Sequence, residues 1–197
     1  MNGNLPDQWV FKGLGLPLIA ADGAANSLAA RNIVPDMIIG DLDSVKNELL
    51  QKGKFLKNDD QNSSDFQKAL KYLETENLMP TIILGLNGGY IDHILNNINI
   101  FLRTKSIFYD EQIIGLGIDN HQTLNLKIGT KLSLFGIPSC CVSTKGLKWD
   151  LDKKELTFPG FNSCFNRTNS ENVAIHIIKG TALLLLYTSL IVDAGLN

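Results

Sequence analysis

The chain has 197 residues, which is enough for one large domain or two small ones, each with its own hydrophobic core. Its 44% of hydrophobic and 19% of charged residues are typical of a globular protein. The net charge is only −2, and no basic block stands out, which argues against binding to nucleic acid or to an anionic membrane. If the substrate is a polyanion, a metal ion must therefore supply much of the positive charge.

The three cysteines, Cys140, Cys141 and Cys164, are an odd number and lack the spacing of a zinc site. Two adjacent cysteines cannot face the same side of a strand. We expect all three to be free thiols without a catalytic role, in a protein of the reducing cytoplasm.

No segment of the sequence predicts export or insertion into a membrane. The N-terminus lacks the basic-then-apolar order of a signal peptide. The most apolar run is 182–186, and its continuation to Val192 is broken by Thr188 and Ser189. A bilayer needs about 20 apolar residues, so we expect a core strand here.

Three apolar runs occur in the first half of the chain, at residues 18–22, 37–41 and 81–86. The first two end in aspartate, and the third leads into Asn87, Gly88 and Gly89. Each is followed by a segment of helical composition, such as the alanine-rich stretch 24–31, which Pro35 prevents from continuing. Alternation of short strands and helices predicts a parallel sheet.

Two further helices are predicted after the second and third runs. Ser63 and Ser64 precede Asp65 as helix-start residues. A one-sided apolar stripe then follows at helical spacing: Phe66, Ala69, Leu70 and Leu73. Asp92 plays a similar part before a second stripe, formed by Ile94, Leu95, Ile98, Phe101 and Leu102.

After about residue 110 the pattern changes to short alternating stretches separated by turn residues. They are centred on Leu132 and Leu134, on Leu147, Trp149 and Leu151, and on Val173, Ile175 and Ile177. Such alternation predicts a small antiparallel β-sandwich. We therefore expect an α/β domain over residues 1–111 and an all-β domain over residues 112–197.

The strongest single signal for chemistry is the pair Asp41 and Asp43, which follows the apolar run 37–39 and Gly40. α/β proteins bind ligands just beyond the carboxyl ends of their strands. Two carboxylates there suit a hard cation such as Mg²⁺, and the glycine allows the backbone to turn closely. A solvated turn is the alternative, because turns use the same residue types.

Further carboxylates stand at other predicted strand ends and helix starts: Asp22, Asp65 and Asp92. In a parallel sheet these positions share one edge, so the side chains would converge and repel unless a cation lies among them. Taken singly, Asp65 and Asp92 are better explained as helix-start residues, and Asp22 as a turn residue.

Two other stretches have a possible functional explanation beside a structural one. The turn 87–90, Asn-Gly-Gly-Tyr, suits close approach to phosphate, with His93 nearby, but it equally suits a flexible turn. It is neither a Walker loop nor a dinucleotide fingerprint. Trp149, on a predicted strand, suits either core packing or a platform for a flat ligand.

Five motifs in order resemble the thiamin pyrophosphokinase family. They are Ala-Asp-Gly-Ala-Ala-Asn at 21–26, Pro-Asp-Met-Ile-Ile-Gly-Asp-Leu-Asp-Ser at 35–44, Asp-Gln-Asn-Ser-Ser-Asp-Phe-Gln-Lys-Ala-Leu at 60–70, Gly-Gly-Tyr-Ile-Asp-His at 88–93 and Thr-Lys-Gly-Leu-Lys-Trp-Asp-Leu at 144–151. The resemblance runs from about residue 18 to residue 166, and the 35–44 and 144–151 blocks are its specific parts.

The resemblance implies a catalytic α/β domain and a thiamine-binding β-sandwich, working as a homodimer with the active site between subunits. The implied reaction transfers the pyrophosphoryl group of ATP to thiamine, with Mg²⁺, and releases AMP. It implies a cytoplasmic enzyme whose partners are thiamine and ATP, with no nucleic acid and no membrane.

The resemblance also implies roles for single residues. The metal ligands would be Asp41, Asp43 and Asp65, and the catalytic group would comprise these three and Asp92. The nucleotide would be bound by Asp22, Gly23, Ser44, Gln61, Gly88, Gly89, His93 and Asn96. Thiamine would contact Trp149, Ser163 and Asn166.

The sequence departs from the family pattern at several points. Tyr90 stands where the family usually has arginine, Phe165 replaces the serine of a Ser-Asn pair, and Asn62 stands where an acid is common. The chain starts at Met1-Asn2-Gly3, where the family usually has a strand just before, so we expect either that the first strand is absent or that the start is truncated. These departures leave two alternatives open: a binding protein that has lost catalysis, and a Mg²⁺-dependent nucleotide hydrolase or transferase with another acceptor.

Overall fold

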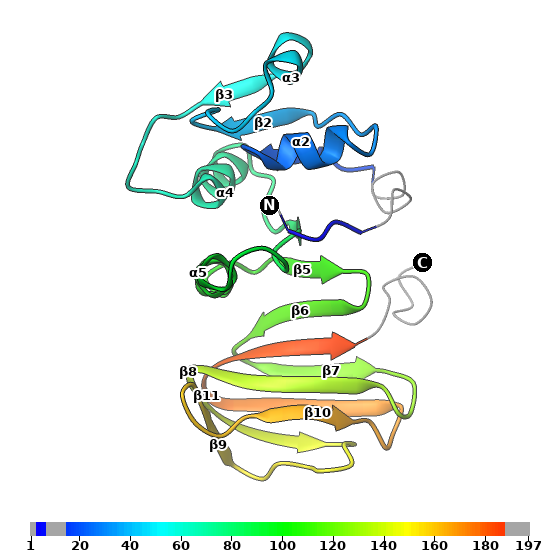
Figure 1. Ribbon diagram of the computed structural model, residues 1–197. Helices are drawn as coiled ribbons and strands as arrows, with labels where there is room; N and C mark the ends of the chain where they lie inside the picture. Colours follow the sequence, from blue (N-terminus) through cyan, green and yellow to red (C-terminus); the bar gives the residue numbers. More distant parts are fainter. Residues whose placement is uncertain (1–2, 7–14, 188–197) are drawn as a thin grey trace. The chain divides into compact units, whose positions relative to one another are not determined.

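The computed structural model describes residues 3–6 and 15–187, which divide into two compact units, one ending at Ile100 and one beginning at Phe101 (Figure 1). The first unit alternates strands and helices, and the second consists of strands. The expected α/β and antiparallel β architectures are therefore both confirmed. No helix within the described ranges is long and apolar enough to span a bilayer.

The first unit contains a parallel three-stranded sheet in the order β1-β2-β3. Its strands are β1 (Ile19–Ala21), β2 (Met37–Gly40) and β3 (Phe55–Lys57). The first two are the apolar runs that the sequence predicts. β3 was missed because its three residues are all exposed, so that it lacks the apolar pattern of a buried strand.

The described residues form four helices beside these strands: α2 (Ala24–Ala29), α3 (Asn47–Lys52), α4 (Asp65–Thr75) and α5 (Ile91–Phe101). α4 contacts both β1 and β2, and α2 contacts β1. Ser64 caps α4 in a capping box with Gln67, which satisfies backbone N–H groups of the first turn. The predicted stripe of α4 is buried. The predicted helix after Asp92 is present as α5, where Phe101 is 1% exposed and Leu95 is 51% exposed.

The third apolar run forms β4 (Ile82–Leu84), but it is not a strand of the β1-β2-β3 sheet. The expectation that all three runs share one parallel sheet is therefore wrong. β1 and β4 instead line a common apolar cavity of about 100 Å³, together with α2 and α4. Short apolar runs predict strands, but they do not state which neighbour a strand pairs with.

The second unit is an antiparallel β domain. Its strands are β5 (Ile107–Asp110), β6 (Ile113–Ile118), β7 (His121–Asn125), β8 (Lys131–Lys145), β9 (Lys154–Thr157), β10 (Ser163–Arg167) and β11 (Asn172–Tyr187). One end of the long strand β11 pairs with β7 and the other with β6, while β8 runs along most of its length. In the same way β8 pairs with β10 at one end and with β9 at the other. The long strands thus serve two sets of neighbours, as expected of a β-sandwich.

The core of this unit comes from the alternating residues that the sequence predicts. Leu132, Leu134, Val173, Ile175 and Leu184 are fully buried. The apolar run 182–186 is part of β11, as expected, and its predicted continuation lies outside the described residues. All three cysteines are free thiols, also as expected.

Trp149 does not lie on a strand. The strand predicted around Leu147 and Trp149 is a turn that follows β8, with Leu147 making an isolated bridge to Thr168. Leu147 is buried and Trp149 is 55% exposed, so core packing does not explain this tryptophan. Gly146, at a φ of +94°, begins the turn, and this left-handed conformation explains why the strand ends there.

Candidate active site

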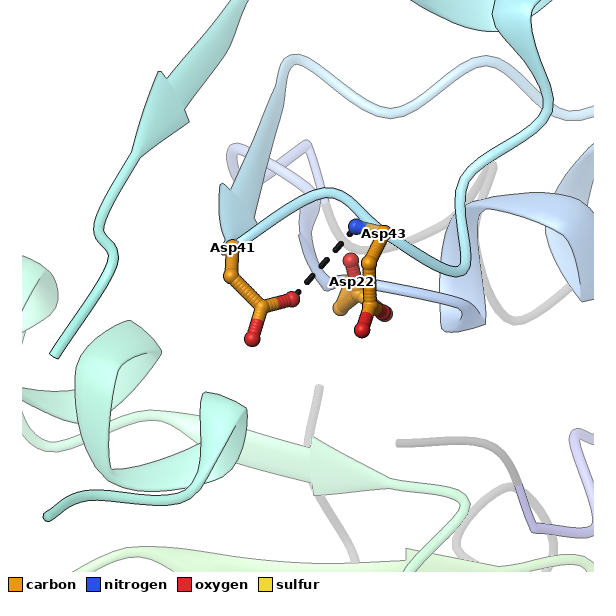
Figure 2. A group of neighbouring side chains, drawn as sticks. All are labelled: Asp22, Asp41 and Asp43. Atoms are coloured by element: carbon orange, nitrogen blue, oxygen red, sulfur yellow. Dashed lines mark hydrogen bonds between the residues drawn. The ribbon is translucent and has the colours of Figure 1, made fainter. Parts of the chain in front are cut away.

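The two aspartates after β2 are set by a strained turn. Leu42, between them, has a φ of +69°, which a leucine rarely adopts. The backbone N–H of Asp43 donates to Oδ1 of Asp41 at 3.4 Å, and the two side chains point into the same space (Figure 2). Strain of this kind is concentrated at functional sites.

The strand ends of β1 and β2 bring a third aspartate to the pair. Asp22 follows β1, and its backbone N–H donates to the carbonyl of Ile39 at 2.8 Å. A Cβ on Gly40 would stand 2.7 Å from Cβ of Asp22, so only glycine permits this approach. One carboxylate oxygen from each of Asp22, Asp41 and Asp43 lies within 4.8 Å of the others (Figure 2).

The three carboxylates differ in their electrostatic surroundings. Burial raises the pKa of Asp22, and the charges of Asp65 and Asp41 add to this rise, against hydrogen bonds from Gly23 and Ser44. By contrast, the backbone N–H of Asp43 lowers the pKa of Asp41, helped by Gln61 and Lys68. Negative charge is thus held in place for Asp41 and disfavoured for Asp22.

This donor set fits a hard divalent cation. Asp22 is only 5% exposed, yet its Oδ1 has no hydrogen-bond partner among the described residues. A buried carboxylate oxygen left without a partner is costly, and a metal ion bound by oxygen ligands removes that cost. The oxygen ligands and the buried oxygen of Asp22 therefore favour a cation among Asp22, Asp41 and Asp43.

Neighbouring polar side chains hold the loop that carries these aspartates. Ser44 Oγ donates to Oδ1 of Asp43 at 2.8 Å, and Gln61 Nε2 to Oδ2 of Asp41 at 3.4 Å. Asn26 of α2 makes two hydrogen bonds to the loop: it donates to the carbonyl of Ser44 at 2.7 Å and accepts from the N–H of Lys46 at 3.0 Å. Asn26 was not among the predicted site residues, although it is a polar residue in an alanine-rich helix start.

Asp65 lies beside the aspartate group and forms an ion pair with a lysine. Its Oδ1 is 3.0 Å from Nζ of Lys68, which is also 3.8 Å from Oδ2 of Asp41. That same oxygen of Asp65 lies 3.1 Å from the position of a Cβ on Gly40, so Asp65 borders the aspartate group. The sequence did not single out Lys68, although its i+3 spacing from Asp65 on a helix was a signal.

The glycine turn that the sequence associates with phosphate is present. Gly88 and Gly89 both have φ values in the left-handed region, +96° and +84°. Asn4 lies against Gly88, and its backbone N–H donates to the carbonyl of Asn87 at 2.6 Å.

The α5 residues that the sequence associates with nucleotide binding are exposed. Asp92 is the second residue of the helix rather than its cap, and it accepts from the N–H of His93 at 2.9 Å. Asn96 is exposed one turn further on. None of the three belongs to the aspartate group.

In the β domain, the residues associated with thiamine do come together. Asn166 is 2% exposed, donates to the carbonyl of Trp149 at 2.8 Å and accepts from its N–H at 3.2 Å. The same amide donates to Ser163 Oγ at 3.3 Å. Phe165, in a bulge of β10 with φ +51°, is 56% exposed and stacks on Tyr187 at 4.9 Å.

Two family models match the chain. The "Thiamin pyrophosphokinase, catalytic domain" matches residues 17–111, which include all four aspartates of the α/β site. The "Thiamin pyrophosphokinase, vitamin B1 binding domain" matches residues 120–181, which include Trp149, Ser163 and Asn166. Together the two models span most of the chain.

Curated relatives and solved structures agree with these matches. The chain is 27% identical over 216 residues to thiamine pyrophosphokinase 1 of Arabidopsis thaliana, covering 91% of this chain and 79% of that protein. It is 26% identical over 203 residues to thiamine pyrophosphokinase 3 of Oryza sativa subsp. japonica, covering 84% and 76%.

The thiamin pyrophosphokinase of Candida albicans shares the fold with a TM-score of 0.81 at 16% identity, covering 95% of this chain and 87% of that one. The Bacillus subtilis thiamine pyrophosphokinase gives 0.77 at 18% identity, covering 95% and 96%. At these identities the structures support the fold alone, whereas the two family models define the relationship. The chain belongs to the thiamin pyrophosphokinase family.

Proposed function

We propose that this protein catalyses the transfer of the pyrophosphoryl group from ATP to thiamine, giving thiamine diphosphate and AMP. The single observation that carries the proposal is the aspartate group after β1 and β2, with its unpartnered Asp22 oxygen, within the match to the catalytic domain. In the reaction the hydroxyethyl oxygen of thiamine bonds to the β-phosphorus and loses its proton to solvent. The bond from that phosphorus to the oxygen shared with the α-phosphate breaks, and AMP leaves.

We assign the metal to Mg²⁺, with Asp41 and Asp43 as ligands, Asp22 beside them and Asp65 bordering the site. Bound there, the cation supplies the positive charge that the triphosphate needs and that this acidic chain lacks. The protein's own part is to hold the acidic loop in position through Asn26, Ser44 and Gln61. Such positioning is the main requirement of phosphoryl transfer, which needs little covalent help.

We assign the phosphates to the turn at Gly88 and Gly89. Asn4 packs against Gly88, but nothing lies within 4 Å of a Cβ position on Gly89, which leaves room for close approach there. In the same proposal Asp92, His93 and Asn96 border the nucleotide from the start of α5, and Gly23 from the start of α2. Asp92 completes the catalytic group with Asp41, Asp43 and Asp65. Thiamine, a cation with two flat rings, contacts the exposed face of Trp149 and the residues Ser163 and Asn166.

The homodimer is part of the proposal. We propose that the thiamine-binding residues of one subunit serve the α/β domain of its partner. The exposed aromatic side chains Trp149, Phe161 and Phe165, each more than half exposed, support an interaction surface on the β domain. Sedimentation at assay concentrations measures the oligomeric state, and a monomer with full activity contradicts this part.

The function is tested by mass spectrometry of purified protein incubated with ATP, Mg²⁺ and thiamine. Thiamine diphosphate and AMP in equal amounts support the proposal. ADP in place of AMP indicates simple phosphoryl transfer, and ATP consumption without thiamine indicates a hydrolase. Bound thiamine without turnover indicates a binding protein.

A further inference from the structure

A lysine is buried inside the acidic site. Lys68 lies on the inward face of α4, and its side chain is only 2% exposed, which is unusual for a residue that carries a full charge. Taking an ammonium out of water is costly unless it is paired and hydrogen-bonded. The position of Lys68 therefore calls for an explanation beyond the packing of a helix.

The contacts of Lys68 identify what it faces. Nζ donates to Oδ1 of Asp65 at 3.0 Å and lies 3.8 Å from Oδ2 of Asp41. The ammonium therefore lies between two carboxylates that the sequence predicts as metal ligands. Burial alone would lower the pKa of Lys68, but Asp65, Asp41 and Asp60 outweigh it and the pKa is raised. The lysine thus carries its charge at neutral pH.

The remaining charges of the site explain why such a cation is useful. Asp22 and Asp65 lie against Gly40, and one carboxylate oxygen from each of Asp22, Asp41 and Asp43 lies within 4.8 Å of the others, so like charges are gathered at this point. Nζ of Lys68 lies beside Oδ2 of Asp41, whereas Oδ1 of Asp41 accepts from the N–H of Asp43. The two oxygens of the Asp41 carboxylate therefore have different partners: the ammonium for Oδ2 and the backbone of Asp43 for Oδ1.

We infer that Lys68 is a resident cation of the acidic site, which keeps Asp41 and Asp65 in position while no divalent metal is bound. It is a positioning residue, because it acts through the carboxylates. The inference rests on the metal site proposed above and adds to it a means of assembly before the metal arrives. If this is so, the stability of a site that has lost the lysine depends more strongly on the divalent metal.

The test compares thermal unfolding of Lys68→Met with the parent, in EDTA and in saturating Mg²⁺ or Mn²⁺. Methionine keeps the length of the side chain and removes the charge. In EDTA we expect the melting temperature to fall by about 2–4 °C, because Asp41 and Asp65, whose side chains are 21% and 34% exposed, lose their buried cationic partner. The divalent metal should recover at least half of that loss, so its stabilising effect is larger than in the parent.

Two further variants separate charge from packing. Lys71→Met makes the same change at an exposed position of the same helix, and it should match the parent with and without metal. Asp65→Asn combined with Lys68→Met removes the charge left unpaired, and it should regain most of the stability lost in EDTA. The double variant also keeps the test available if Lys68→Met alone does not fold.

The outcomes distinguish the inference from the function on which it rests. If the parent binds and is stabilised by the metal, but Lys68→Met loses the same stability in EDTA and in metal, Lys68 only packs and the inference is overturned. A double variant no more stable than Lys68→Met overturns it as well. A parent that neither binds nor responds to Mg²⁺ or Mn²⁺ overturns the metal site itself, and the inference with it.

Discussion

Two loops carry the proposed chemistry, and they are built in opposite ways. The acidic loop, residues 41–46, contains a strained Leu42. It gathers like charges around Oδ1 of Asp22, which has no hydrogen-bond partner within the described part of the chain. The tryptophan turn, residues 146–150, is saturated with hydrogen bonds: Asp150 accepts from Leu147 and Thr144, and Asn166 holds both backbone groups of Trp149.

The difference indicates what each loop needs from a ligand. The acidic loop stores repulsion that a cation relieves, so ligand binding and local stability are coupled there. The backbone of the tryptophan turn is held by hydrogen bonds within the protein. The ring of Trp149 is 55% exposed, and Nζ of Lys148 lies 4.6 Å from its centre. Substitutions in the first loop should therefore affect chemistry more than folding, and those behind the second should affect folding and binding together.

The largest effect is expected for Asp43→Asn in the acidic loop. Asparagine keeps the shape and removes one of the charges proposed to hold the metal, so turnover should fall by about 10²–10³-fold. Because Asp43 is exposed, the stability should change by no more than about 0.5 kcal/mol. Steady-state kinetics and thermal unfolding measure the two quantities.

The control is Asp59→Asn, which removes the same charge from an exposed surface pair with Lys57. It should leave both quantities near the parent. An Asp43→Asn enzyme with parental turnover would contradict the metal assignment.

Gly40→Ala tests how the strand ends assemble the same loop. The new methyl group would stand 2.7 Å from Cβ of Asp22, so one of the two chains must move. We expect about a tenfold loss of kcat/KM and a destabilisation of about 1–3 kcal/mol. Gly117→Ala in β6 is the steric control, because its methyl group comes closest to a side-chain carbon of Leu102, at 3.3 Å, and the backbone atoms of Leu102 are 3.7 Å or more away. Unchanged activity and stability in Gly40→Ala would contradict the importance of the close approach between Gly40 and Asp22.

Asn166→Leu tests the tryptophan turn. Leucine is similar in size but cannot hold the backbone of Trp149, so buried polar groups lose their partners at a cost of about 1–3 kcal/mol. We expect a loss of stability and a several-fold rise in KM for thiamine, with KM for ATP near the parent. Asn169→Ala is the control, because the bond of Asn169 to Gly146 uses the backbone N–H and survives the change. A higher KM for ATP alone would contradict the assignment of this turn to thiamine.

The fold was predictable wherever local pattern decides it. Runs ending at Gly40 and Ala21, the capped helix after Ser64 and the alternation around Leu132 all gave the right element, since periodicity and capping are local properties. The partner of a strand is not local. β3 has no buried residue and β4 lies outside the β1-β2-β3 sheet, so the sheet order could not be predicted.

The candidate site was predictable to a similar degree. The convergence of Asp22 with Asp41 and Asp43 follows from strand ends that share an edge, and the structure brings the three together. Lys68 escaped because a lysine on a helix is usually exposed, and only the packing of α4 on β1 and β2 buries it. Trp149 was placed on a strand because alternation was followed across Gly146, whose positive φ ends that strand.

The smallest effect, and the most specific for the acidic loop, is expected for Asp22→Asn in metal-free protein. The pKa of Asp22 is raised in the folded protein, so the folded state binds more protons than the unfolded state between the ordinary value, 3.8, and the raised one. Stability is therefore lost as the pH rises through that window, and above it the charged Asp22 destabilises the fold. Asparagine removes this charge, so at neutral pH the melting temperature in EDTA should rise by about 2–4 °C, the effect of roughly 1 kcal/mol in a chain of this size.

The same substitution should reverse its sign when metal is added, because Asp22 then loses its favourable interaction with the cation. Asp41→Asn is the matched comparison: the pKa of Asp41 is lowered, so its charge stabilises the fold above pH 3.8 and is lost as the pH falls below that value. In EDTA, Asp41→Asn should therefore lower the melting temperature where Asp22→Asn raises it. Equal shifts for both variants would mean that the two carboxylates experience the same field, and the acidic loop would then have no built-in preference for a cation near Asp22.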